Sequence, residues 1–161
     1  MVISTGVCGS LPGSRLSNSD VVIATNSCYA DEGMVAESGF RSIASMGFPL
    51  GNFSDAGVAC EPGLAARCRA LGFREGPIAT VSTCSGTDKA AEAVAARTGA
   101  IAEAMEGAAI GQVCVRLVVA FGELRSVSNN TGDRARQVWE LDRALAALTA
   151  AFAGLRPMFS D

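Results

Sequence analysis

Short, β-branched apolar runs alternate along the chain with longer segments whose apolar residues recur every three or four positions. The runs DVVIAT at 20–25 and PIATVST at 77–83 are too short and too rich in β-branched residues for helices, so they predict buried strands. The predicted strands are one beginning at Val2 and Ile3, followed by 20–25, 77–83, 101–105 and 121–128.

The remaining apolar segments have helical spacing or helical flanking residues. Residues 63–71 predict a short helix, and Thr87 is a candidate N-cap for a helix that reaches about Arg97. Small residues fill a further predicted helix at 107–117. The closing helix, predicted at about 135–155, carries one apolar stripe: Val138, Leu141, Leu145, Leu148, Phe152 and Leu155.

Strands that alternate with helices predict a single α/β domain over residues 1–161 with a largely buried sheet. Ligands of such sheets usually bind at the carboxyl ends of the strands. Polar clusters follow three of the predicted strands, at Gly6 to Ser10, at Met105-Glu106 and at Ser128-Asn129-Asn130. We therefore expect these clusters to face one crevice at that edge.

Composition narrows the classes of function. The 161 residues are 49% hydrophobic and carry a net charge of −3, which gives no general attraction to nucleic acid or anionic lipid. The sequence contains no histidine, which excludes a Ser-His-Asp triad, a Cys-His dyad and a histidine-ligated metal site. No apolar run approaches the roughly 18–20 residues that span a bilayer. We expect no metal, no nucleic-acid partner and no membrane partner.

The cysteines indicate a reducing compartment. The six cysteines form no CxxC pair, and the start of the chain, MVIST, lacks the basic and apolar regions of a signal peptide. We expect small, reduced and mostly buried thiols in a cytoplasmic protein.

Several polar positions allow both a chemical and a structural interpretation. Glu106 lies among small and apolar residues, where a buried carboxylate is costly unless it binds something; alternatively, it only complements the N-terminus of the next helix. The segment Ser128-Asn129-Asn130 either caps the next segment of the chain or presents an amide to the edge of a base. Gly6 and Gly9 predict a turn, which is either only a turn or brings backbone amides close to a ligand.

Two further features are interpreted structurally. Trp139 has helical spacing from core residues, so we expect it to pack in the core. Asp133, Arg134 and Arg136 are expected to form a solvated charged face rather than an anion site.

Three segments together resemble the nucleoside phosphorylase and nucleosidase superfamily: STGVCGSLPGS at 4–14, EAMEGAAIGQVC at 103–114 and FGELRSVSNNTGDRARQVW at 121–139. The SNN and TGDR segments, with YADEG at 29–33 and MGFPL at 46–50, are most similar to the futalosine hydrolases of that superfamily. The resemblance implies a three-layer αβα fold, with a mixed sheet flanked by helices, and no cofactor.

Site residues are implied by the resemblance position by position. Glu106 would bind the ribose hydroxyls and Met105 would pack on the sugar. Asn129, supported by Ser128, would bind the purine. The other implied substrate-binding residues are Val7, Cys8 and Gly9, on the side from which water attacks, and Thr83 and Cys84, along the base.

The implied reaction is hydrolysis of the N-ribosidic bond of futalosine, a small-molecule nucleoside, releasing hypoxanthine and dehypoxanthine futalosine in menaquinone biosynthesis. Asn129 stands where aminopurine nucleosidases carry aspartate, which favours a hypoxanthine-type base. A purine nucleoside phosphorylase or another purine nucleosidase of the same fold is the alternative enzyme. The resemblance also implies a homo-oligomer, and it does not assign the residues that bind the carboxyphenyl end of futalosine.

The resemblance implies more chain than the sequence contains. Members of the superfamily have a strand, a helix and a further strand before the glycine segment, and their water-activating glutamate lies in that part. This chain begins inside the strand that leads to the glycines. We therefore expect an N-terminally truncated domain, and a catalytically inactive fragment is a further alternative.

Overall fold

A mixed sheet of six strands forms the centre of the molecule and closes on itself, because β8 pairs with both β1 and β2. The computed structural model describes residues 1–48 and 57–158, so Pro49 and Leu50 of the MGFPL segment lie outside the described residues. The strand order is β5-β2-β6-β7-β1-β8. The strands are β1 (Val2–Ser10), β2 (Val21–Tyr29), β5 (Val58–Ala59), β6 (Arg74–Thr80), β7 (Ala102–Ala104) and β8 (Phe121–Asn130); β3 (Gly33–Ala36) and β4 (Gly39–Ser42) form a separate ribbon.

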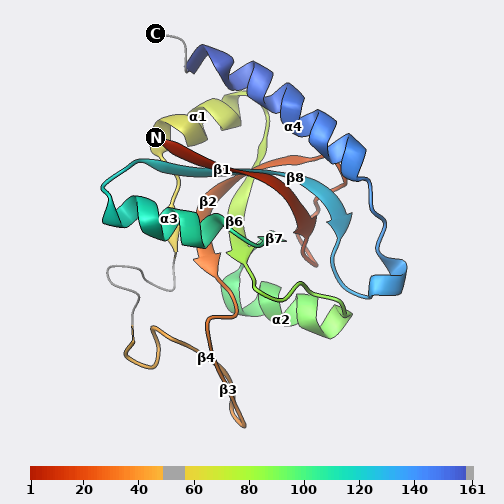
Figure 1. The fold of residues 1–161 in the computed structure, drawn as a ribbon. Coiled ribbons are helices and arrows are strands. Elements are labelled where there is room, and N and C mark those ends of the chain that lie inside the picture. The colour runs from red at the N-terminus through yellow and green to blue at the C-terminus, as the bar shows by residue number, and fades with distance from the viewer. Residues whose placement is uncertain (49–56, 159–161) are drawn as a thin grey trace.

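Helices cover both sides of this sheet (Figure 1). On one side, α1 (Pro62–Ala70) and α4 (Leu141–Leu155) place Leu64, Leu148 and Leu155 against Ile23 and Leu124 of the strands. On the other side lie α2 (Asp88–Thr98) and α3 (Gly107–Arg116) (Figure 1). The predicted three-layer arrangement of a mixed sheet flanked by helices is therefore confirmed. No helix in the described ranges is long and apolar enough to cross a membrane.

The predicted N-cap of α2 is confirmed. The Thr87 side chain accepts a hydrogen bond from the Ala90 backbone at 3.2 Å, and Gly99 ends the helix in the left-handed conformation. These residues satisfy backbone groups that a helix cannot pair internally. The predicted helix at 63–71 and the one at 107–117 also form, within a residue or two of the predicted bounds.

The glycine segment Gly6 to Ser10 is not a turn, contrary to the prediction. It continues β1, which pairs with β8 along its length, so sheet hydrogen bonds satisfy its backbone. The glycines serve close packing instead. A Cβ at Gly6 would lie 2.7 Å from Arg125 Nη1, and one at Gly9 would lie 2.7 Å from Thr131 Cγ2.

The closing helix begins at Leu141, and its prediction from about 135 is wrong at that end. Residues Arg134–Arg136 form a single 3-10 turn, and the chain then runs in extended form. Side chains compete successfully with helical hydrogen bonds there. Asp133 Oδ1 accepts from the Ala135 backbone at 3.0 Å, and Asn130 Oδ1 accepts from the Val138 backbone at 2.9 Å.

Candidate active site

A cavity of about 890 Å³ opens among β1, β7, β8 and the segment after β6. The structure brings all the predicted site residues except Thr83 to this cavity. Thr83 is exposed, and its backbone N–H donates to Asp31 at 3.1 Å. The predicted residues that line the cavity are Val7, Cys8, Gly9, Cys84, Met105, Glu106, Ser128 and Asn129.

These residues meet for a different reason from the one expected. β7 runs antiparallel to β1, with Glu103 opposite Gly9, so the two strands do not end at the same edge. The chain leaving β7 therefore carries Met105 and Glu106 along the middle of β1. Asn129 reaches the cavity from β8, which is parallel to β1 and pairs Asn129 with Gly9.

Arg125 links β8 to Glu106. The guanidinium is buried, with only 4% of the side chain exposed, and its Nη1 lies 2.9 Å from Glu106 Oε2. Its Nη2 donates to Ser4 Oγ at 3.0 Å. The glycine at position 6 leaves room for this side chain. Arg125 therefore fixes one carboxylate oxygen of Glu106, and Oε1 has no partner among the described residues.

A second carboxylate lies behind Arg125. Glu123 is fully buried, accepts from Arg125 Nε at 2.8 Å and accepts a short hydrogen bond from the Ser27 hydroxyl. Burial raises the pKa of Glu123, and the Arg125 guanidinium opposes that rise. Two carboxylates thus pair with one guanidinium. The positive charge of Arg125 is therefore already compensated and does not favour binding of a further anion.

Arg125 and Glu123 are site residues that were not predicted from the sequence, because only the apolar positions of the strand FGELRSV supported the prediction of a buried strand. The available signal was their spacing. Residues two apart on a strand point to the same face, so Glu123 and Arg125 within a buried strand indicate a paired charge rather than a solvated one.

Glu106 is not buried, contrary to the expectation from its small and apolar neighbours. Its side chain is 57% exposed toward the cavity. It occupies the N-cap position of α3 but makes no capping hydrogen bond with its side chain. The carboxylate is therefore held by Arg125 rather than by the helix terminus.

The segment Ser128-Asn129-Asn130 combines both interpretations. Asn130 takes the structural role, because its Oδ1 accepts from the Val138 backbone. Asn129 faces the cavity, although it is almost completely buried. Ser128 Oγ donates to Asn129 Oδ1 at 2.9 Å, and Asn129 Nδ2 donates to the Asn130 carbonyl at 3.0 Å, so the amide has a fixed plane.

Glu103 holds the segment after β6 in the cavity wall. This buried carboxylate accepts from the Ser85 backbone at 2.9 Å and from the Ser85 hydroxyl at 2.7 Å. The bonds fix Cys84 beside Met105, with 3.6 Å between their sulfur atoms. Met105 itself is half-exposed and offers an apolar surface to the cavity.

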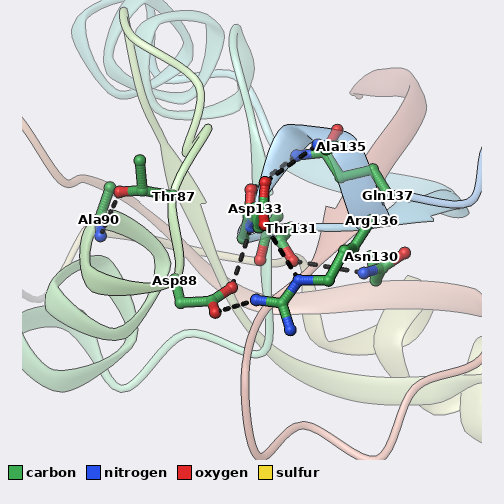
Figure 2. A network of polar contacts seen from close by, with 10 residues as sticks. Thr87, Asp88, Ala90, Asn130, Thr131, Asp133, Ala135, Arg136 and Gln137 are labelled. Atoms are coloured by element: carbon green, nitrogen blue, oxygen red, sulfur yellow. Dashed lines mark hydrogen bonds and ion pairs between the residues drawn. The ribbon is translucent and has the colours of Figure 1, made fainter.

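Trp139 does not pack in the core, contrary to the prediction. The residue precedes α4, is 50% exposed and lines the cavity. The expected solvated face is confirmed for Asp133 and Arg136, which are linked with Asp88 in an exposed network (Figure 2). Arg134 differs from them because it lines the cavity.

The two thiols that line the cavity, Cys8 and Cys84, show no activation for nucleophilic attack. Burial raises the pKa of Cys8 to about 12, and burial with nearby carboxylates also raises the pKa of Cys84. Five of the six cysteines are buried, as predicted, and Cys84 is exposed. In the part of the chain that the structure describes, no group of three or more acidic or cysteine side chains could hold a metal ion.

Comparison with protein families decides the classification. The family model described as the phosphorylase superfamily matches residues 1–155. The chain belongs to the phosphorylase superfamily. It is 37% identical over 157 residues to the futalosine hydrolase of Acidothermus cellulolyticus, covering 96% of this chain and 64% of that protein. It is 36% identical to the futalosine hydrolase of Streptomyces coelicolor, covering 100% of this chain and 67% of that protein.

Solved structures of the superfamily share the fold. A futalosine hydrolase mutant from Helicobacter pylori superposes with a TM-score of 0.74 at 23% identity, covering 98% of this chain and 68% of that one. The 5'-methylthioadenosine/S-adenosylhomocysteine nucleosidase of Neisseria meningitidis, in complex with methylthio-immucillin-A, superposes with a TM-score of 0.72 at 23% identity. The superposition covers 95% of this chain and 67% of that one. The predicted resemblance to futalosine hydrolases is thus confirmed, and the chain spans about two thirds of the length of these relatives.

Proposed function

We propose that this phosphorylase-superfamily protein is an N-glycosyl hydrolase that cleaves the N-ribosidic bond of futalosine. The observation that carries the proposal is the Glu106–Arg125 pair, because one carboxylate oxygen of Glu106 has no partner in residues 1–48 and 57–158 and lies in the same cavity as the Asn129 amide. The names of the curated relatives support futalosine as the substrate. Hypoxanthine and dehypoxanthine futalosine would be the products, as a step of menaquinone biosynthesis.

Glu106 acts on the sugar in this proposal. Its Oε1 accepts hydrogen bonds from the ribose hydroxyls, while Arg125 holds Oε2 in place. Cleavage of a glycosidic bond develops positive charge on the sugar ring, so a fixed carboxylate stabilises the transition state more than the bound nucleoside. Met105, which is half-exposed, packs its side chain against the sugar.

Asn129 acts on the base. Its amide is held in plane by Ser128 and by the Asn130 carbonyl, so the donor and acceptor keep a fixed orientation toward a ring edge. The amide suits a base that presents a carbonyl oxygen beside a ring nitrogen, as hypoxanthine does. Because a leaving purine gains electron density, a hydrogen-bond donor at this edge stabilises its departure.

Water rather than phosphate is the proposed nucleophile. A phosphate that attacks from the β1 side of the sugar needs a cation there. Arg125 lies beside β1 but already binds Glu106 and Glu123, whereas Arg134 reaches the cavity from the segment after β8. Ser4 and Thr5 of β1 line the cavity and carry no charge, and the Ser4 hydroxyl accepts a hydrogen bond from Arg125. Val7, Cys8 and Gly9 line the side from which water attacks.

The direct test is release of hypoxanthine from futalosine by the purified protein, with and without inorganic phosphate. We expect equal rates in both buffers. Strict dependence on phosphate would make the protein a phosphorylase instead. The absence of hypoxanthine release in either buffer would contradict the proposal for this chain.

Asn129→Asp tests how the base is recognised. A carboxylate facing a base carbonyl puts two acceptors together and costs roughly 1–3 kcal/mol, a loss of about 5- to 150-fold in kcat/KM for inosine. Adenosine carries an exocyclic amine that can donate to the carboxylate, so its relative kcat/KM should rise. An unchanged inosine-to-adenosine ratio would show that Asn129 serves only the turn.

A further inference from the structure

The segment after β8 is fixed beside the cavity by a network that Figure 2 shows. Arg136 binds Asp88, the first residue of α2, and its Nε donates to Asp133 at 3.0 Å. The Asp133 backbone donates to Asp88 Oδ1 at 2.9 Å. The short 3-10 turn at Arg134–Arg136 is thereby tied to the start of α2.

A second cluster on the same segment faces the cavity. The Arg134 guanidinium lies over the Trp139 ring, 4.9 Å from its centroid, and donates to Gln137 Oε1 at 2.8 Å. Trp139 Nε1 donates to the same oxygen at 3.0 Å. Gln137 in turn donates to the Gly132 carbonyl at 3.0 Å and to the Ser85 carbonyl at 3.3 Å. Arg134, Gln137 and Trp139 therefore form one ordered part of the cavity wall.

Charge distinguishes Arg134 from its neighbours. Arg125 and Arg136 each pair with two carboxylates. Arg134 pairs with none in residues 1–48 and 57–158, although it lines the cavity and is exposed. A guanidinium has five N–H donors, and the structure uses one of them for Gln137. The cavity wall thus carries one arginine without a counter-charge among those residues, stacked on an aromatic ring.

We propose that Arg134 and Trp139 form a subsite for an aryl carboxylate attached to the nucleoside. This inference rests on the proposed function, since futalosine carries a carboxyphenyl group at the end opposite its hypoxanthine. A guanidinium binds a carboxylate through two parallel hydrogen bonds, and the indole face offers a stacking surface for an aromatic ring. Inorganic phosphate would use the guanidinium but not the indole, so the pair of side chains favours the aryl carboxylate.

The test compares binding of futalosine and inosine, which share the base and ribose but differ in the carboxyphenyl group. Titration calorimetry on Arg134→Gln should show futalosine binding weakened by about 10-fold or more, as expected for a lost charge-assisted hydrogen-bond pair. Inosine binding should stay within about 2-fold of the wild-type value. Arg134→Lys keeps the charge without the paired donors, so its affinity for futalosine should lie between those of the wild type and Arg134→Gln.

Arg143→Gln is the matched control, because it removes the same charge from an exposed arginine on α4 that does not line the cavity. It should leave both affinities unchanged. Trp139→Leu should weaken futalosine binding by several-fold and leave inosine binding close to that of wild type.

The remaining outcomes separate the subsite from the proposed activity. Equal weakening of futalosine and inosine in Arg134→Gln, or no weakening, contradicts the subsite and leaves the proposed nucleosidase activity standing. Competition between phosphate and inosine that disappears in Arg134→Gln would make Arg134 a phosphate site and overturn the inference. If the wild type binds neither nucleoside, both the subsite and the proposed function are wrong.

Discussion

Arg125 and Arg136 each pair with two carboxylates, but Arg125 is enclosed by the sheet whereas Arg136 faces solvent. The side chain of Arg125 is 4% exposed, and that of Arg136 is 67% exposed. Arg125 has one fully buried partner, Glu123, and one exposed partner, Glu106, at 57%, whereas both partners of Arg136 are exposed, Asp88 at 58% and Asp133 at 47%. Similar chemistry therefore occurs in two very different solvent environments.

The difference in burial separates two functions of an ion pair. Removing one partner of a buried pair leaves a charge without water or a counter-charge, whereas an exposed pair can exchange its partner for solvent. We infer that the Arg125 network fixes the geometry of Glu106. The Arg136 network holds a surface segment in place but contributes little to the free energy of unfolding. Substitutions in the two networks should therefore differ in effect, from a large loss at Arg125 to a small one at Arg136.

Arg125→Met should produce the largest loss of stability. It leaves Glu123 buried without its counter-charge, and breaking a buried pair in this way costs about 3–5 kcal/mol. Chemical denaturation should report the loss as a lower midpoint. Adding Glu123→Leu to Arg125→Met should recover much of it, because the remaining buried charge is then gone. If the double variant is no more stable than Arg125→Met, the buried charge is not the source of the cost.

Glu106→Gln should leave stability nearly unchanged and reduce catalysis. The substitution keeps the shape of the side chain but removes the negative charge that faces the developing positive charge on the sugar. We expect kcat for futalosine to fall by about 10²-fold or more, with a smaller change in KM, since the interaction strengthens in the transition state. A rise in KM at constant kcat would mean that Glu106 only binds the nucleoside.

The sequence predicted the elements of this molecule better than their arrangement. Local signals predicted α2 and its N-cap, because the Thr87 side chain acts within the first turn of the helix. The antiparallel pairing of β7 with β1 depends on residues that are far apart in the chain. No local pattern shows that Glu106 lies beside the middle of a strand rather than at a common edge.

The candidate site divides in the same way. Glu106, Met105 and Asn129 were identified through their resemblance to a known family, and the structure brings them to one cavity. Glu123 and Arg125 were missed because a strand pattern describes which faces are buried and does not indicate which charges pair. Trp139 was misassigned because Asn130 and Asp133 end the local backbone pattern with side-chain hydrogen bonds, so the helical spacing that placed Trp139 in the core never forms.

Comparing the wild type with Glu123→Gln should show how burial of the Glu123 carboxyl makes folding stability depend on pH. Burial raises the pKa of Glu123 above its usual value of 4.5, so the folded protein retains the proton when the unfolded chain has released it. Folding stability from this group is therefore fully present below about pH 4.5 and is lost as pH rises through the raised pKa. The stability of the wild type relative to Glu123→Gln should thus decrease with rising pH. Chemical denaturation of both proteins between pH 4.5 and 8 measures this difference in stability. A relative stability that increases with pH would mean that the Arg125 guanidinium lowers the pKa of Glu123 more than burial raises it.

Substitutions in the Arg136 network should change the free energy of unfolding least. Arg136, Asp88 and Asp133 are all exposed to a large degree, so solvent screens their attraction and can replace each partner. A double-mutant cycle with Arg136→Gln and Asp88→Asn should yield a coupling free energy of about 0–1 kcal/mol at physiological salt. The coupling should shrink further at high salt, while the destabilisation caused by Arg125→Met should change little, since buried charges are poorly screened. A coupling in the Arg136 cycle as large as that expected for Arg125 would show that burial does not separate the two networks, because the exposed pair would then be as hard to replace by water as the enclosed one.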